Sequence, residues 1–350
     1  MTDTPPIIFP EGKMIEDYKV VDHIGHGGYG EIYSVLDTRN NVMYAMKVEM
    51  KAAAKQGLVQ EIEFFETLKQ SPLFPEYVYS GSNSEFRFLI MELLGPSLSK
   101  MRRALPNHRY TPICSIRLAY HMLRCIEKFH EQGFIHRDIK PGNFLIRCDR
   151  ENPVCLTDFG LSKSYLIDPK RDRSHIPFRE QVGFVGTCKY ASIHAHEGRE
   201  LSRRDDLLSW FYSIIELAES RVPWPGSRDR DRTFYMKKST KPEHLCRALP
   251  IEFAMIYNNL MSLQFDQKPD YRALNNLLSE AMRKVDCEKK FDWEFLDDET
   301  LDSISAIPLK FQENDKMKMD FESNTGAMPS NNEKKKKDED EQEGGCCTIQ

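Results

Sequence analysis

The chain of 350 residues has no apolar run that approaches the ~20 residues needed to cross a bilayer. Residues 1–6 carry neither the basic residues nor the apolar core of a secretory signal peptide. Nine cysteines, an odd number, include no Cys-x-x-Cys pair. Reduced thiols are therefore favoured over disulfides or a zinc site, and we expect a cytoplasmic protein.

The chain also has little net charge. A formal charge of −5 argues against a general nucleic-acid binder. Hydrophobic residues make up 40% of the chain and charged residues 29%, which is ordinary for a soluble globular protein. No internal repeat is visible, and 350 residues suffice for one large domain or two lobes.

The first third of the chain predicts a small, β-rich lobe. Residues 18–35 have the pattern of a strand, a glycine turn and a second strand, and residues 43–48 and 86–93 alternate like further strands. Residues 58–69 place Leu58, Ile62, Phe65 and Leu68 on one face of a helix.

From about residue 98 the pattern becomes helical. Thr111 and Pro112 resemble an N-cap followed by proline at the first helical position, and Gly133 is placed to end that helix. Residues 207–217 are apolar nearly all round and predict a central buried helix. Residues 251–262 and 271–285 predict two more helices. The pattern fades after 286, and residues 312–350 have the composition of a disordered tail.

Residues 135–144 read Ile-His-Arg-Asp-Ile-Lys-Pro-Gly-Asn-Phe, and residues 157–160 read Thr-Asp-Phe-Gly. This order and spacing are typical of phosphoryl transfer in protein kinases. Asp138 would orient the acceptor hydroxyl and accept its proton, and Lys140 would neutralise charge on the transferred group. Asn143 and Asp158 would hold Mg²⁺ through oxygen atoms. The alternative, a plain surface turn at 136–138, leaves the other three groups to coincidence.

Residues 25–30, Gly-His-Gly-Gly-Tyr-Gly, match G-x-G-x-x-G, which is also the form of the dinucleotide fingerprint. That fingerprint opens a helix, whereas residues 31–35 here have the pattern of a strand. The strand–turn–strand context favours a flap over nucleotide phosphates. A glycine-rich turn without a ligand is the alternative.

Lys47 lies in an apolar strand, where a lysine normally points outward. In a kinase it would contact the α- and β-phosphates of the nucleotide and pair with a helix glutamate. Glu61 is the expected partner because it lies off the apolar stripe and in register, and Glu63 is the second candidate.

Residues 18–285 resemble eukaryotic protein kinases, and within them the casein kinase I superfamily. Residues 186–194, Gly-Thr-Cys-Lys-Tyr-Ala-Ser-Ile-His, replace the usual Ala-Pro-Glu motif. Residues 202–207 and the hinge-like residues 91–98 also match that superfamily, as do residues 222–224. Residues 182–187 and 210–212 resemble the tau-tubulin-kinase-like branch. His194 departs from the usual asparagine, which should alter local packing and leave catalysis in place.

The resemblance implies a two-lobed α+β fold, with a β-rich N-lobe and a helical C-lobe. Residues 1–17 would be an N-terminal extension, 18–285 the kinase domain and 286–350 a tail. It further implies a monomeric serine/threonine kinase that uses ATP and Mg²⁺ on protein substrates. Thr187 would bridge Asp138 and Lys140, Asp206 would anchor the catalytic loop, and Met91 would be the gatekeeper. The implied nucleotide-binding residues are Ile24, Gly25, His26, Gly27, Gly28, Tyr29, Gly30, Glu31, Ile32, Ala45, Lys47, Glu61, Met91, Glu92, Leu94 and Leu145.

In the same family an arginine at the position of Arg179 helps to bind an anion near the substrate site. This predicts a preference for acidic or already phosphorylated substrates, to which Lys237 and Lys238 could contribute. A solvated basic loop is the alternative.

The chain ends Cys-Cys-Thr-Ile-Gln. Cys347 fits the C-a-a-X pattern of farnesylation, and Cys346 could be palmitoylated as the second signal for a membrane tether. An unmodified tail is the alternative. For the whole chain, a kinase-fold scaffold without turnover remains open, although Lys47, Asp138, Asn143 and Asp158 are all present. A small-molecule kinase is a third reading, which the casein-kinase-like residues 186–194 disfavour.

Overall fold

The computed structural model describes residues 9–28, 30–53, 56–168, 171–224, 229–285 and 290–309. The chain divides into two compact units, Met1–Lys318 and Met319–Gln350, and the second lies wholly outside the described residues. Tyr29, the expected disordered tail, Cys346 and Cys347 also lie outside them. No helix in the described ranges combines the length and apolarity needed to cross a membrane.

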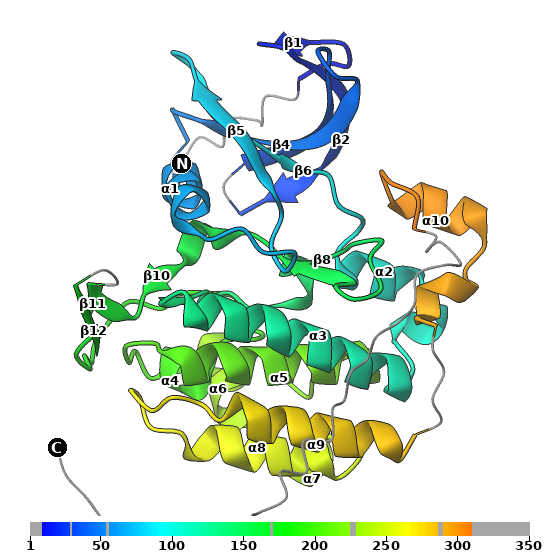
Figure 1. Cartoon of the computed structure of the whole chain (residues 1–350). Coiled ribbons are helices and arrows are strands. Elements are labelled where there is room, and N and C mark those ends of the chain that lie inside the picture. Colours follow the sequence, from blue (N-terminus) through cyan, green and yellow to red (C-terminus); the bar gives the residue numbers. More distant parts are fainter. Residues whose placement is uncertain are drawn as a thin grey trace, which may run out of the picture. The chain divides into compact units, whose positions relative to one another are not determined.

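The N-lobe is a curled sheet of six strands in the order β1-β2-β3-β4-β6-β5, each antiparallel to its neighbour (Figure 1). The strands are β1 Met14–Ile15, β2 Tyr18–Gly27, β3 Gly30–Asp37, β4 Val42–Met50, β5 Tyr77–Ser82 and β6 Phe86–Glu92. Tyr33, Val35, Met46 and Val48 alternate along β3 and β4 and form part of one core cluster. Lys47, between two of these core residues, therefore points to the other face of the sheet.

The C-lobe is helical, which confirms the expected two-lobed α+β fold. Its helices are α2 Leu98–Ala104, α3 Pro112–Glu131, α4 Ile193–His196, α5 Arg203–Glu219, α6 Arg230–Ser239, α7 Pro242–Leu245, α8 Glu252–Ser262, α9 Tyr271–Arg283 and α10 Asp298–Ile304. Short 3-10 turns are η1 Pro106–His108, η2 Pro141–Asn143, η3 Phe159–Leu161 and η4 Asp292–Phe295. The strand pairs are β7 Phe134–Ile135 with β10 Lys163–Ser164, β8 Phe144–Ile146 with β9 Val154–Leu156, and β11 Leu166–Asp168 with β12 Asp172–His175.

Helix α3 begins where the sequence predicts. The Thr111 hydroxyl accepts a hydrogen bond from Cys114 N at 3.3 Å, and Pro112 fills the first helical position. Helix α5 is buried on all sides as expected and packs against α3, with the indole of Trp210 donating to Ala119 O at 3.1 Å. Helices α3 and α5 lie side by side in the middle of the C-lobe (Figure 1).

Two short elements after residue 286, η4 and α10, are absent from the sequence pattern. Phe291 stacks on Trp293 with ring centroids 4.4 Å apart, and the Arg117 guanidinium lies 3.9 Å from the centroid of the Phe291 ring. These contacts are tertiary and leave no helical period in the sequence. The chain then brings Leu309, which is buried, against Gly95 in the connection between the lobes.

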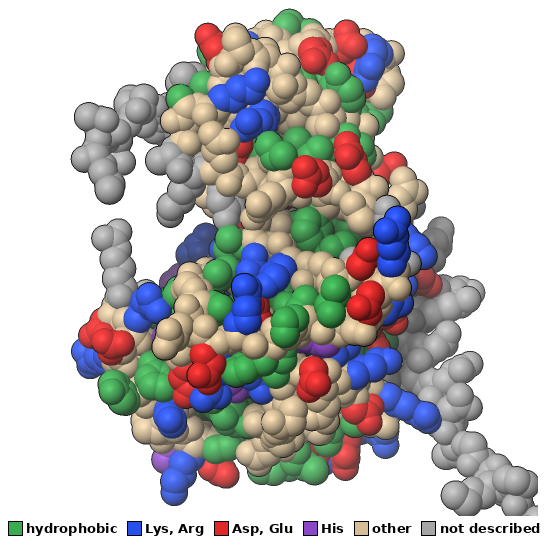
Figure 2. Space-filling model, turned by 90° about the vertical axis from the view of Figure 1, so that its left-hand side faces the viewer, with side chains coloured by type: hydrophobic (Ala, Val, Ile, Leu, Met, Phe, Trp, Pro, Cys, Tyr) green, Lys and Arg blue, Asp and Glu red, His purple; other side chains and the backbone are tan. Residues whose placement is uncertain are grey.

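Acidic and basic side chains are both spread over the side of the molecule that carries helix α1 (Leu58–Thr67) and the β11–β12 hairpin (Figure 2). Figure 2 shows acidic and basic side chains interspersed on this face. This distribution agrees with the mild net charge of −5.

Candidate active site

Lys47 makes the central ion pair of the N-lobe. Its Nζ lies 2.5 Å from Glu61 Oε2 in α1, which spans Leu58–Thr67, and 2.9 Å from Asp158 Oδ1. Burial alone would favour the neutral amine, but the two carboxylates outweigh it and raise the pKa of Lys47 above its ordinary value. The lysine therefore stays charged, and it joins the N-lobe to the residue expected to hold a metal.

Helix α1 is oriented by a residue that the sequence analysis did not identify. Gly57, at its N-cap, has no side chain to cap the helix, and Glu49 of β4 supplies the acceptor instead. Glu49 Oε2 accepts from Gly57 N at 2.6 Å and from Leu58 N at 2.9 Å. This remote cap leaves Glu61 buried and facing Lys47, whereas Glu63 is exposed.

Asp158 is held towards the cleft by the residue that follows it. Its φ of 66° is left-handed, and Phe159 next to it is fully buried. The Phe159 ring stacks on Phe129 at 5.3 Å and meets Phe74 edge-on at 5.8 Å. Burial would raise the pKa of Asp158, but the nearby Lys47 ammonium reverses this and lowers it. Asp158 is therefore presented as a carboxylate.

Asp206 of α5 ties down the loop that carries Asp138. Its two carboxylate oxygens accept from His136 N at 2.7 Å and Arg137 N at 2.8 Å. The backbone of Arg137 is left-handed, with φ of 66°, so these bonds hold a conformation that a free loop would avoid. His130 of α3, 2.9 Å from Asp206, completes this support and was missed because it lies on a helix face without a local motif.

Asp138 uses both of its oxygens. Oδ2 lies 2.5 Å from Lys140 Nζ, and Oδ1 accepts from the Thr187 backbone at 2.9 Å and the Thr187 hydroxyl at 2.7 Å. Lys140 Nζ is 3.4 Å from the same hydroxyl, so Thr187 contacts both groups. Gly186 makes this approach feasible, because its φ is +96° and a Cβ there would lie 2.5 Å from Arg137 O.

The residues proposed for the metal offer oxygen ligands. Asn143 donates through Nδ2 to Asp138 O at 2.9 Å, which leaves its amide oxygen for a cation. Asp158 offers a carboxylate, one oxygen of which lies 2.9 Å from Lys47 Nζ. Within the described ranges no cluster of three His, Cys, Asp or Glu residues could hold a metal by itself. This fits Mg²⁺, which protein sites usually bind through one or two side chains together with substrate phosphates.

The glycine turn between β2 and β3 lies over these groups. A Cβ at Gly27 would be 3.2 Å from Lys47 Cε, and one at Gly28 would be 3.7 Å from Asp158 Oδ2. Side chains here would narrow the space for phosphates, whereas glycine leaves it open. Glu31 bridges two histidines of β2, with His23 at 2.6 Å and His26 at 2.8 Å.

The remaining residues implied for the nucleotide lie in the strands of the N-lobe or close to them, and in β8. Met91 pairs in the sheet with Ala45 and Tyr77, and Gly25 pairs with Ile32 across the β2–β3 hairpin. Gly30, a Cβ of which would lie 1.9 Å from Val48 O, must be glycine. The implied nucleotide-binding residues in or next to β2, β3, β4, β6 and β8 are Ile24, Gly25, His26, Ile32, Ala45, Met91, Glu92, Leu94 and Leu145.

The side chain of Glu92 is used in an ion pair within the protein. It pairs with Arg147, which also donates to Phe74 O at 3.3 Å. The backbone continues to Gly95, whose N–H donates to Ile146 O at 2.8 Å. The ion pair of Glu92 with Arg147 and the hydrogen bond from Gly95 N to Ile146 O thus hold the connection between the lobes against the C-lobe.

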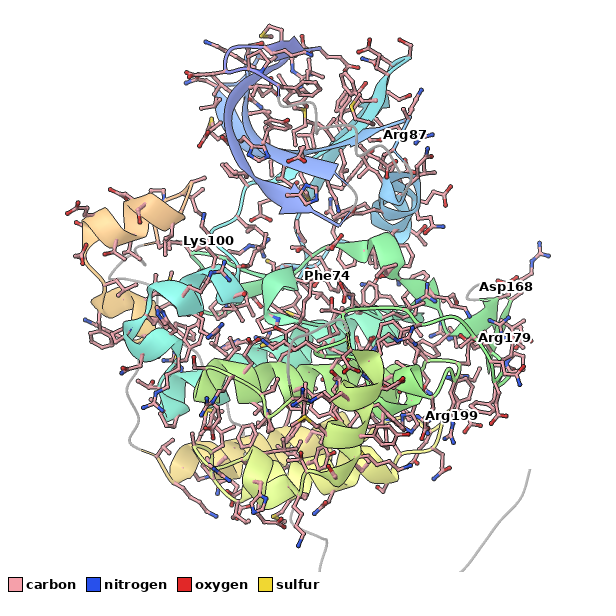
Figure 3. The ribbon with its side chains drawn as sticks, turned by 180° about the vertical axis from the view of Figure 1, so that it is seen from behind. Phe74, Arg87, Lys100, Asp168, Arg179 and Arg199 are labelled. Atoms are coloured by element: carbon pink, nitrogen blue, oxygen red, sulfur yellow. The ribbon has the colours of Figure 1, made fainter. Side chains whose placement is uncertain are left out.

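The structure places Arg179 beside Glu200. Arg179 Nε donates to Glu200 Oε2 at 2.7 Å, and Lys163 Nζ lies 2.8 Å from the other oxygen of the same carboxylate. Burial would raise the pKa of Glu200, but these two cations lower it. Arg179 lies along the same edge of the C-lobe as Asp168 and Arg199 (Figure 3). Nothing in the sequence near Arg179 indicated Glu200 as its partner.

Two further residues singled out in the sequence, Lys237 and His194, are both buried. Lys237 is buried with 1% of its surface exposed, so the expectation that it helps to bind a substrate anion is wrong. His194 places Nδ1 2.9 Å from Asp205 Oδ1 and is buried. It thus joins a hydrogen-bonded cluster at the start of α5.

Comparisons with known proteins bear on this site. A family model described as protein kinase domain matches residues 18–286, which is well over half of the chain. A probable serine/threonine-protein kinase of Dictyostelium discoideum is 34% identical over 291 residues, or 82% of this chain. The chain spans 58% of the length of that relative. By the extent of both matches, the chain belongs to the protein kinase family.

Proposed function

We propose that the protein is a serine/threonine protein kinase that transfers the γ-phosphate of ATP to protein hydroxyls. One observation carries this proposal: Asp138 contacts both Lys140 and Thr187, with Asp138 Oδ1 2.7 Å from the Thr187 hydroxyl. The protein kinase domain and the serine/threonine kinase relative support the same activity and imply the use of ATP and a divalent metal, typically Mg²⁺.

Each group has a role that follows from its contacts. Asp138 orients the acceptor hydroxyl and takes its proton, and Lys140 neutralises charge that builds up on the transferred group. Lys47 contacts the α- and β-phosphates, held in place by Glu61 at 2.5 Å. Asn143 and Asp158 would hold Mg²⁺, which supplies positive charge at the phosphates. The chain therefore contributes position and electrostatics, with little covalent chemistry.

The test is transfer of radiolabelled phosphate from ATP to casein, with Asp138→Asn as the matched control. Asp138→Asn keeps the size of the side chain and removes its charge. Phosphoserine or phosphothreonine that disappears in the variant supports the proposal. No transfer above the variant, from folded protein that binds ATP, would leave the kinase-fold scaffold as the function.

We further propose that the chain belongs to the casein kinase I superfamily, on residues 186–194 and 202–207. Residues 182–187 and 210–212 support its tau-tubulin-kinase-like branch. With that assignment goes a preference for acidic or phosphorylated sites. Arg179 and Lys163 together face one carboxylate, Glu200, so one positive charge is left over. The Arg179 side chain is 60% exposed and can reach a substrate anion.

A pair of peptides tests this preference. They share one sequence and differ only in a phosphoserine before the acceptor. Arg179→Gln should raise KM for the phosphorylated peptide by about fivefold and leave the unphosphorylated one unchanged. Equal effects on both peptides would count against an anion site and favour a solvated basic loop.

We further propose that the protein is a cytoplasmic monomer with a lipidated C-terminus. Farnesyl on Cys347 with palmitoyl on Cys346 would give the two signals that stable membrane anchoring needs. Mass spectrometry of the C-terminal peptide from cells tests this directly, with Cys347→Ser as control. An unmodified Cys347 in a protein found only in the soluble fraction would refute the tether.

A further inference from the structure

Lys237 is a buried lysine that the proposed chemistry does not use. It lies on α6, a helix of mostly polar sequence, yet it is 1% exposed. Its Nζ donates to Cys188 O at 2.9 Å and to Ala191 O at 2.6 Å. A third neighbour, His196 Nε2, lies at 3.3 Å. An ammonium has three N–H donors, and the two carbonyl oxygens accept from two of them.

Two aromatic rings lie close to this ammonium. Its Nζ lies 5.0 Å from the centroid of the Tyr212 ring and 5.3 Å from that of Trp224. Among the described residues no carboxylate lies within 4.0 Å of it, and burial lowers the pKa of Lys237 to about 7. A buried charge held only by carbonyls, an imidazole and ring faces is costly, so its presence needs a reason.

The reason lies in the loop that it holds. Residues 187–192 begin at Thr187, which contacts Asp138 on the catalytic side. Lys237 binds the carbonyl oxygens of the same loop from the opposite side, and Trp224 Nε1 donates to Lys189 O at 2.8 Å. The loop is thus fixed between the catalytic aspartate and α6.

We propose that Lys237 is a positioning residue that sets the shape of the 187–192 loop for the acceptor segment of the protein substrate. The proposal rests on the proposed function. An acceptor hydroxyl at Asp138 must bring its neighbouring residues onto the loop that leaves Thr187. Lys237 therefore affects how tightly the protein substrate binds, while the nucleotide, on the far side of Asp138, is unaffected.

Protonation of Lys237 adds a pH dependence. Loss of the proton removes one donor and turns two charge-assisted hydrogen bonds into ordinary ones, so the loop loosens as pH rises. The titratable or charged groups around it are His196 of α4, Tyr212 of α5, the Cys188 thiol and, beside His196, Arg230 of α6. Burial lowers the pKa of His196 to about 4 and raises that of Tyr212 well above its usual value, so neither changes charge between pH 6 and 9.

The experiment measures steady-state constants of the full chain for ATP and for an acceptor peptide. Lys237→Met keeps the length of the side chain and removes its donors, and Lys241→Met, at an exposed position nearby, is the matched control. In Lys237→Met we expect peptide KM to rise about tenfold with ATP KM within about twofold. Wild-type peptide KM should rise about threefold from pH 6.5 to 8.5, and Lys237→Met should not follow. Cys188→Ser, which removes the neighbouring thiol, should keep the wild-type profile.

Unchanged peptide KM in folded Lys237→Met, or equal changes in both substrates, would overturn the proposal. If that variant does not fold, amide hydrogen exchange of the wild-type loop decides. After correction for intrinsic rates, residues 187–192 should lose protection from pH 6.5 to 8.5, and constant protection would overturn the role. Wild-type protein that transfers no phosphate would refute the proposed function, and hydrogen exchange would still report on the loop.

Discussion

Two lysines of this protein are almost completely buried, and their surroundings differ. Lys47, 2% exposed, lies between the carboxylates of Glu61 and Asp158. Lys237, 1% exposed, has carbonyl oxygens, an imidazole nitrogen and two ring faces around it. The carboxylates raise the pKa of Lys47, whereas burial lowers that of Lys237 to about 7. An ion-paired lysine is thus a fixed charge, and a carbonyl-held lysine is one whose charge depends on pH.

The largest expected effect comes from breaking the ion-paired site. Lys47→Met leaves the buried Glu61 and the partly buried Asp158 without a cation, which should cost about 3–5 kcal/mol of unfolding free energy. Catalytic efficiency should fall by at least about 100-fold, because the phosphates lose their cation. Chemical denaturation and peptide phosphorylation measure the two losses. A variant that retains a tenth of the activity would show that Lys47 is not the phosphate ligand.

The same substitution at the other lysine should change the slope of stability with pH. The folded-state pKa of Lys237, about 7, lies below its ordinary value of 10.5, so the unfolded chain binds more protons between these limits. Wild-type stability relative to Lys237→Met should therefore rise by about 1 kcal/mol per pH unit from pH 7 to 10. The gain disappears as pH falls to 7. Parallel stability curves for the two proteins would mean that Lys237 is charged throughout.

A smaller effect is expected at Trp224, which binds the same loop as the Lys237 ammonium. Trp224→Phe removes the indole bond to Lys189 O and some packing, which should cost about 1–3 kcal/mol. Peptide KM should rise by only about twofold to threefold, with the wild-type dependence on pH, since Lys237 remains. An effect on peptide KM as large as that of Lys237→Met would mean that the Trp224 indole, and not the Lys237 ammonium, sets the shape of the 187–192 loop.

The smallest effect is expected at the surface. His26 is 70% exposed and pairs with Glu31 at 2.8 Å on the glycine turn. His26→Gln should change unfolding free energy by less than about 0.5 kcal/mol, and ATP KM by less than about twofold, because exposed pairs contribute little. Titration of ATP into both proteins checks this. A fivefold change in ATP KM would show that the exposed pair shapes the nucleotide site.

Local patterns in the sequence carried much of the fold and the site. Apolar periodicity predicted β3, β4, α3 and α5, because each buries a regular face. The order of Asp138, Asn143 and Asp158 predicted the group that the structure brings together. The sequence favoured Glu61 over Glu63, and Glu61 is the one that contacts Lys47. The reason given, a place off the apolar stripe, is wrong, because Glu61 is buried together with Leu58 and Phe65.

The rest depends on contacts between distant segments. Glu49 caps α1 from another element, and His130 supports Asp206 from α3, so neither has a signal beside it in the sequence. Lys237 appears in a polar stretch that predicts a surface lysine, and it is buried because residues 188–191 fold over it. Phe291 and Trp293 fold η4 by stacking on each other, which no helical period reports.

Leu309 gives the molecule a boundary different from that of its family. The family match ends at residue 286, yet Leu309 lies against Gly95, and Cys148 Sγ donates to Pro308 O at 2.8 Å. A protein that ended at residue 286 would keep every proposed catalytic residue. It would lose the contact of Leu309 with Gly95 and the hydrogen bond from Cys148 to Pro308. The stretch that the family model matches is therefore shorter than the folded unit of this chain.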